Sequence, residues 1–329
     1  MNTTREHVFD ELHSESILSE ASYQKYREQQ VAGLFSVHWE LKTLLYLGVI
    51  LLSGGFGIWV YRNIGSIGHQ VILISLVSVC VGCFFYCIRY GRIFSRNKIE
   101  SPNTFFDYAL LLACLCFITI IGYIQYQFHF FGEKYGLATF IPMVVLFISA
   151  YYFDHLGVLS LGITNLAVWL GIAVTPIQLL RANDFDNDRI IFTGVFLGVV
   201  LMMTAFISVK YKFKKHFEFT YSNFGMHVLF VSVLAGMFHF EDIYLLWFLP
   251  CAGVSYFFYR RSLARKSFYI ILVTTLYTYV ALAYVAVRFV DSFIGTTTAA
   301  LYAGFLYFII SAVAMVIFLI RMNRKLKAE

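Results

Sequence analysis

Ten long apolar stretches in succession constrain the fold of this sequence more than any other feature. The first, residues 41–62, reads LKTLLYLGVILLSGGFGIWVYR. An α-helix rises 1.5 Å per residue, so about 20 apolar residues cross the roughly 30 Å hydrocarbon core of a membrane. The other stretches lie near residues 69–88, 105–126, 137–153, 156–177, 190–209, 221–240, 243–259, 267–288 and 298–320. We therefore predict an all-α polytopic transmembrane bundle of about ten spans, residues 41–329, preceded by a short cytosolic helical segment, residues 1–40.

Composition supports a membrane setting. Hydrophobic residues make up 60% of the 329 residues and charged residues only 13%, whereas soluble domains are about 45–50% apolar and 25% charged. Too few polar residues are present to cover a water-facing surface, and the lipid bilayer as a partner removes that difficulty. The six cysteines all lie inside predicted spans, which excludes a secreted disulfide framework. Cys80, Cys83 and Cys87 share a helix face and are interpreted as packing residues, so no metal and no cofactor is predicted.

Basic residues set the predicted orientation. The N-terminal part and the connections after even-numbered spans hold 20 of the 25 Lys and Arg residues, and the odd-numbered connections hold the other 5. Cytoplasmic loops carry the excess of Lys and Arg, so both termini are predicted to be cytoplasmic. These residues occur in short runs between apolar stretches, a pattern typical of topology signals. It argues against a nucleic-acid partner.

Residues 1–40 form a polar preface to the spans. Thr3 to Glu6 fits a capping box, and the segment holds seven acidic residues in all. A segment of this size cannot build its own core. We expect it either to dock on the membrane domain or to bind a protein partner.

Several segments together resemble a known family. ILSEASYQKYREQQ, followed after a short gap by LLYLGVILLSGGFGIWVYRNIGSIGH, is similar to bacterial membrane proteins of the domain-of-unknown-function 2157 family. SPNTFFDYALLL, GLATFIPMVVLFISAYYFDHLGVLSLGITNLAVWLG and FTYSNFGMHVLF also resemble members from Bacteroidota-type bacteria. The resemblance implies a multi-pass protein of the bacterial inner membrane. It implies no activity and no catalytic residues.

Polar side chains at or near membrane depth are the candidate site residues, because such groups are costly and face the bundle interior or water. Asp154 and His155 occupy the tight turn predicted between the fourth and fifth spans. Side by side they could relay a proton, or they could simply cap the helical hairpin. Asp107 lies in the first turns of the third span, after Ser101 as the predicted cap and Pro102 as the first helical residue. The helix dipole alone would explain a carboxylate at this helix N-terminus.

Two further candidates lie inside spans. Asn165 falls near the middle of the fifth span and His227 in the cytoplasmic half of the seventh. Each could contact a solute, and each could equally hydrogen-bond a neighbouring helix. Pro142 and Pro250 should interrupt the fourth and eighth spans, either as broken helices like those that line some transporter sites or as ordinary kinks in packed helices.

Three functions remain open from the sequence. A transporter or permease for a small solute predicts a polar cavity near Asn165 and His227. A scaffold or sensor would engage a partner through residues 1–40. An intramembrane enzyme acting on lipid would use Asp154 and His155 as acid and base. No hydrolase, nucleotide-binding or metalloprotease motif occurs in usable context, which disfavours an enzyme.

Overall fold

The computed structural model describes residues 68–92, 94–132, 135–171, 188–295 and 298–328, together with isolated positions before residue 68. Every regular element among these residues is helical, which confirms the all-α class. The predicted first span, and the predicted fifth span beyond residue 171, lie outside the described residues, so the count of ten spans stays a prediction. The chain divides into two compact units, residues 1–72 and 73–329.

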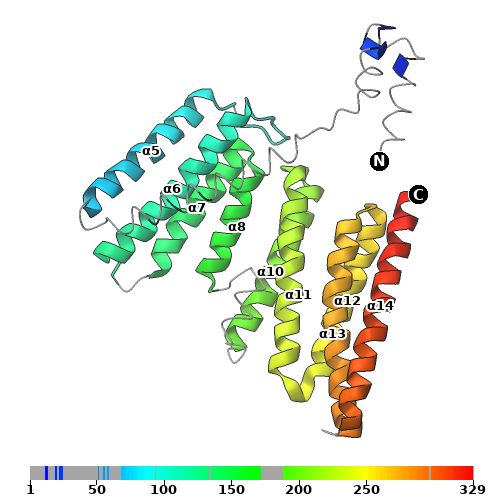
Figure 1. The fold of residues 1–329 in the computed structure, drawn as a ribbon. Coiled ribbons are helices and arrows are strands. Elements are labelled where there is room, and N and C mark those ends of the chain that lie inside the picture. Colours follow the sequence, from blue (N-terminus) through cyan, green and yellow to red (C-terminus); the bar gives the residue numbers. More distant parts are fainter. Residues whose placement is uncertain are drawn as a thin grey trace. The chain divides into compact units, whose positions relative to one another are not determined.

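Nine long helices follow one another along the described chain (Figure 1). They are α5 (His69–Tyr90), α6 (Thr104–Phe128), α7 (Tyr135–Phe153), α8 (Leu156–Trp169), α10 (Asp188–Lys210), α11 (Glu218–His239), α12 (Tyr244–Ala264), α13 (Phe268–Ile294) and α14 (Thr298–Ala328), with 3-10 turns η1 (Lys215–Phe217) and η2 (Glu241–Ile243) at the two ends of α11. All except α8 are long and apolar enough to cross a membrane. In such helices the backbone N–H and C=O groups form hydrogen bonds with one another, as a bilayer without water requires.

Helix α11 is the centre of the second unit. Within the most apolar part of α11, 72% of the residues are buried, against 6% for α14. One hydrophobic core joins α11 to α5–α8 and α10, and a second joins it to α12 and α13. Phe217 in η1 and Phe230 in α11 are both fully buried. Helix α14 packs on α13 and leaves most of its apolar surface exposed.

Small residues allow α10 and α11 to approach closely. A Cβ atom built on Gly198 of α10 would lie 2.6 Å from Cγ of Leu229 on α11, nearer than atoms can pack. Close backbone approach of this type is a main source of helix association in lipid, where no hydrophobic effect draws helices together.

The predicted interruptions at proline do not occur. Pro142 lies within α7 and Pro250 within α12, and both helices continue past the proline. Proline removes one backbone hydrogen bond, and in a membrane breaking the helix would leave several more groups unsatisfied. The helices are therefore not broken at either proline, and the alternative of an ordinary kink in a packed helix stays a prediction.

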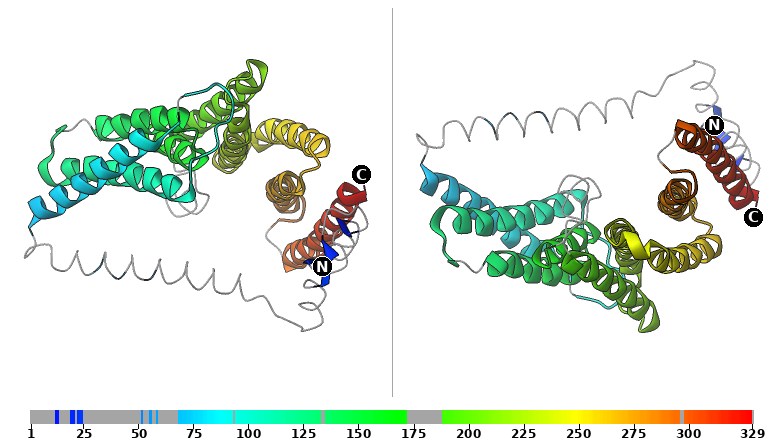
Figure 2. Two further views of the ribbon diagram at one scale, coloured as in Figure 1. Left: turned by 90° about the horizontal axis from the view of Figure 1, so that it is seen from above. Right: turned by 90° about the horizontal axis from the view of Figure 1, so that it is seen from below.

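Helices α12, α13 and α14 form a row in chain order, with α13 between the other two (Figure 2). Residues of all three helices line one cavity.

Candidate functional site

Asp154 joins three connections at one end of the second unit. It occupies the turn between α7 and α8 with a φ of 60°, and its side chain is fully buried. Oδ2 accepts a hydrogen bond of 2.5 Å from the backbone N–H of Ile99, in the α5–α6 connection. Oδ2 also lies 3.2 Å from Nζ of Lys214, and Oδ1 pairs with Nε2 of His216, both in the α10–α11 connection. Both carboxylate oxygens are thus occupied.

Lys214 is buried as completely as its partner. The side chain is fully buried, with Nζ 5.2 Å from the centre of the Phe94 ring. Its backbone N–H donates to the carbonyl of Arg96 at 2.9 Å, and Ser208 Oγ donates to the Lys214 carbonyl at 3.1 Å. A buried ammonium requires a paired charge, and Asp154 supplies it.

His155 turns away from Asp154 toward Asp107. It is the N-cap of α8, where Nδ1 accepts a hydrogen bond of 3.1 Å from the Val158 N–H. Nε2 lies 3.8 Å from Oδ1 of Asp107. Burial lowers the pKa of His155, and the negative charge of Asp107 partly offsets this effect. The structure therefore gives Asp154 and His155 different partners and does not join them as an acid–base pair.

The cap of α6 differs from the prediction. Asn103 is the N-cap, and its Oδ1 accepts from the Phe106 N–H at 2.7 Å. Ser101, predicted as the cap, instead donates its hydroxyl to Oδ2 of Asp107 at 3.0 Å. Asp107 lies in the first turn of α6, where the helix dipole favours a carboxylate.

His227 forms a directed chain of hydrogen bonds between α11 and α13. Tyr269 donates its only proton to Oδ1 of Asn223 at 3.0 Å, so it accepts from Nε2–H of His227 at 3.1 Å. Nδ1 of His227 then accepts from the hydroxyl of Tyr277 at 3.0 Å. Both ring nitrogens are satisfied by protein groups, which is what a helix-joining histidine requires.

Asn165 lies in α8 and is partly buried. Its Oδ1 atom is inaccessible and has no hydrogen-bond partner among the described residues. Residues 172–187, which follow α8, are not described. Asn165 therefore keeps an acceptor that no described group uses, near the middle of its predicted span.

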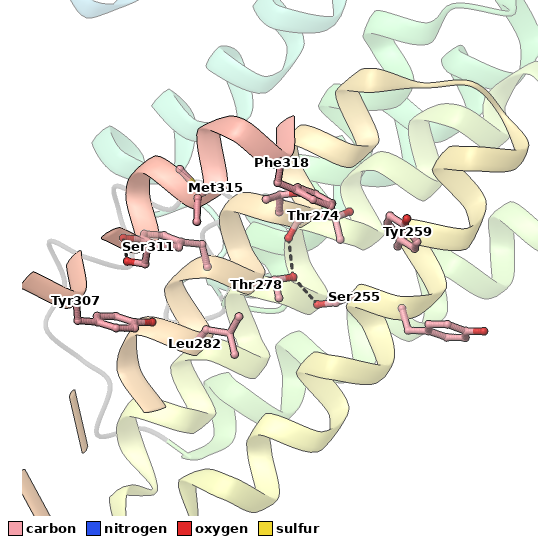
Figure 3. A pocket seen from close by; sticks show the side chains of 13 residues that line it. Ser255, Tyr259, Thr274, Thr278, Leu282, Tyr307, Ser311, Met315 and Phe318 are labelled. Carbon is pink, nitrogen blue, oxygen red and sulfur yellow. Dashed lines mark hydrogen bonds between the residues drawn. The ribbon is translucent and has the colours of Figure 1, made fainter. Parts of the chain in front are cut away.

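A cavity of about 480 Å³ lies between α12, α13 and α14, and sequence reasoning did not find it. Its size falls within the roughly 300–1,000 Å³ of small-molecule pockets. Residues that carry hydroxyl groups contribute to its wall from all three helices, but the surface that faces the open space is almost entirely apolar (Figure 3). Its lining is Ser255, Tyr256, Tyr259, Thr274, Thr275, Thr278, Tyr279, Leu282, Tyr307, Ser311, Ala314, Met315 and Phe318. None of the predicted site residues belongs to this set.

The fold and these sites define a class, the polytopic α-helical membrane protein with polar groups placed among apolar helices. Residues 6–159 match the model of a protein family described as Predicted membrane protein (DUF2157). The match confirms the family resemblance read from the sequence and supports a multi-pass membrane location. Comparison with curated proteins and with solved structures found no match. The matched region includes Asp107, Asp154 and His155 and ends within α8, so the cavity lies beyond it.

Proposed function

We propose that the protein is a transporter or permease for a small solute, and that the cavity between α12, α13 and α14 is its solute site. The observation that carries the proposal is a ligand-sized cavity with hydroxyl groups on three membrane-capable helices. The hydroxyls of Ser255, Thr278, Tyr279 and Ser311 already form hydrogen bonds within the protein, so the open space of the cavity suits a small and largely apolar solute. We also propose a bacterial inner-membrane location with both termini in the cytoplasm, which the loop distribution of Lys and Arg supports.

Access from both sides of the membrane tests this proposal. In a variant whose six native cysteines are replaced, Thr275→Cys and Ser311→Cys each place one thiol in the cavity. Membrane vesicles of each orientation are treated with a charged, membrane-impermeant methanethiosulfonate. A transporter that alternates its access reacts from both faces. Val313→Cys, on the exposed apolar surface of α14, is the control and should react from neither face.

A different pattern would reject transport. If the cavity thiols react only with a lipid-soluble maleimide, and never with the charged reagent, water does not reach the cavity and the transport proposal fails. Tags at Asn187 and Asn323 test the orientation separately, because the proposal requires them on opposite sides of the membrane.

A scaffold or sensor is the second candidate function. It is favoured by one observation: the family match begins at residue 6 and so includes the acidic preface together with the first predicted spans. Deleting residues 1–35 should then remove a co-purifying partner from affinity-purified protein while the bundle still folds. Identical purified material with and without the preface would remove the support for this function.

The structure does not support the hypothesis of a lipid-modifying enzyme that uses Asp154 and His155 as acid and base. It needs a free carboxylate beside a free imidazole, but both oxygens of Asp154 are bound and His155 caps α8. We therefore do not propose catalysis at this turn.

A further inference from the structure

The interior of the cavity between α12, α13 and α14 suits a hydrocarbon chain. The surface that faces the open space is almost entirely apolar, and hydroxyls of the wall bond within the protein, as Thr278 does to the Thr274 carbonyl at 2.7 Å. A polar ligand group there would give up its bonds to water without replacement, which is costly. Tyr256, Leu282 and Phe318 line the cavity and are also exposed on the apolar surface of the helices, so the cavity opens sideways onto the surrounding lipid.

The cavity is about as long as one leaflet of a bilayer is deep. Its lining on α14 runs from Tyr307 to Phe318 (Figure 3). At 1.5 Å per residue this stretch of helix measures about 16 Å. Half of the roughly 30 Å hydrocarbon core of a bilayer is about 15 Å. The acyl chain of a lipid, which extends through one leaflet, therefore matches the length of the cavity.

A basic surface adjoins one end of the cavity. The end of α12, the start of α13 and the end of α14 meet there in one apolar cluster, to which Tyr259 and Met322 belong. Arg260 follows Tyr259 directly, and Arg321 lies less than one helical turn beyond Phe318. Both arginines are exposed. The cavity thus extends from a charged rim into the apolar part of the three helices.

The two arginines of this rim have no carboxylate partner in the described part of the chain. Glu218 of α11 pairs with Arg261 and Arg265 instead. Within α12, α13 and α14 the one acidic residue is Asp291, which lies near the opposite end of α13. A guanidinium binds phosphate through two parallel hydrogen bonds, and basic pockets between membrane helices bind anionic headgroups. The rim is therefore complementary to the phosphate of a lipid.

We infer that the cavity binds an anionic phospholipid, with one acyl chain between α12, α13 and α14 and the phosphate on Arg260 and Arg321. The inference rests on the proposed function, because it names the solute class of the same cavity. The positive charge of the rim selects an anionic headgroup, and the apolar interior takes one chain. The sideways opening leaves the second chain in the bilayer. In the proposed orientation the lipid belongs to the cytoplasmic leaflet.

The test measures lipid occupancy and does not depend on transport. Full-length protein is placed in nanodiscs of phosphatidylcholine that contain a trace of phosphatidylglycerol with a diazirine in the middle of one acyl chain. After illumination, the labelled residues are mapped by peptide mass spectrometry. We expect label in the cavity wall despite the large excess of zwitterionic lipid. Added unlabelled phosphatidylglycerol should displace it, and the mole fraction that halves the label measures the affinity.

Charge variants test the contact with the headgroup. Arg260→Gln and Arg321→Gln should each raise the half-displacing mole fraction on the order of fivefold, which is the contribution of one basic side chain near anionic lipid. Arg89→Gln removes the same charge from an exposed position in the last turn of α5 and should leave the mole fraction unchanged. All three positions are exposed, so these variants should fold like the wild type.

Two tryptophan variants test the contact with the chain. Ala314→Trp places an indole ring in the cavity and should abolish the label in its wall. Val313→Trp adds the same ring to the exposed apolar surface of α14, one residue earlier and outside the cavity lining, and should keep the label.

Three results would overturn the inference: label spread evenly over the apolar surfaces of the helices, an unchanged half-displacing mole fraction in both the Arg260→Gln and Arg321→Gln variants, or equal labelling of Ala314→Trp and Val313→Trp. Lipid in the cavity without two-sided thiol access would leave the site and reject transport. Two-sided access without lipid in the cavity would leave transport and reject this solute class.

Discussion

Replacing Asp154 by Asn should destabilise the protein strongly, because it leaves a buried cation without its counter-ion. The variant removes the charge opposite Lys214, whose ammonium is fully buried and lies 3.2 Å from Asp154 Oδ2. Breaking a buried ion pair from one side costs about 3–5 kcal/mol, because the other charge stays in a low-dielectric interior without compensation. The amide also weakens the bonds to the Ile99 N–H and to His216, so three helix connections lose their common anchor.

The measurement is a double-mutant cycle on protein in detergent. The wild type, Asp154→Asn, Lys214→Met and the double variant are compared by unfolding in denaturant. Each single variant should lose several kcal/mol. The double variant should regain at least half of the loss of the Asn variant, because neither buried charge remains. Methionine keeps much of the length and the apolar character of the lysine stem, so lost packing contributes little.

Two results would refute the reasoning. One is a loss below about 1 kcal/mol for Asp154→Asn, which would mean that water reaches Lys214 and screens it as it does a surface pair. The other is a double variant whose loss equals the sum of the single losses, which would mean that the two side chains are not coupled.

Two further predictions concern neighbouring features. Burial lowers the pKa of His155 below its ordinary 6.5, so the unfolded chain binds a proton more readily than the folded chain, and stability should fall as the pH drops below about 6.5. His155→Asn keeps a helix cap and should flatten that pH dependence of the unfolding midpoint; an unchanged slope would contradict the assignment. Gly198→Ala should lower the free energy of unfolding by about 1–3 kcal/mol, because the added methyl group clashes with Leu229. Gly122→Ala is the control and should not destabilise the protein, because a Cβ atom there meets nothing within 4 Å. Equal free energies of unfolding for the two variants would show that α10 and α11 are less tightly packed.

The sequence was sufficient for the class of fold and for most helix positions in the described part. Apolar runs of membrane length are a strong signal, since lipid leaves few alternatives to a helix. The turn at Asp154 was also readable, because one uninterrupted helix there would have been about twice the thickness of the hydrocarbon core. The break expected at Pro250 was not found, because a single missing bond does not end a helix held by its neighbours.

The partners of the polar residues were not readable. Lys214 counted as a topology signal in the sequence, yet it is a buried partner of Asp154 from a different helix connection. The cavity was missed for a related reason. Ser255, Thr274 and Ser311 are ordinary hydroxyl residues in three separate apolar helices, and no periodicity says which helix faces meet. Only the tertiary arrangement distinguishes the unsatisfied hydroxyl of Thr274 from the satisfied ones.

This contrast bears on how a binding site in a membrane protein is recognised. Ionisable residues attract attention first because their burial is so costly, but that cost also means that a buried charge must have a permanent partner, as Asp154 has in Lys214. A neutral hydroxyl left without a partner costs only about 1–3 kcal/mol, which a folded protein can tolerate. In this bundle the charged cluster of Asp154 and Lys214 therefore stabilises the fold.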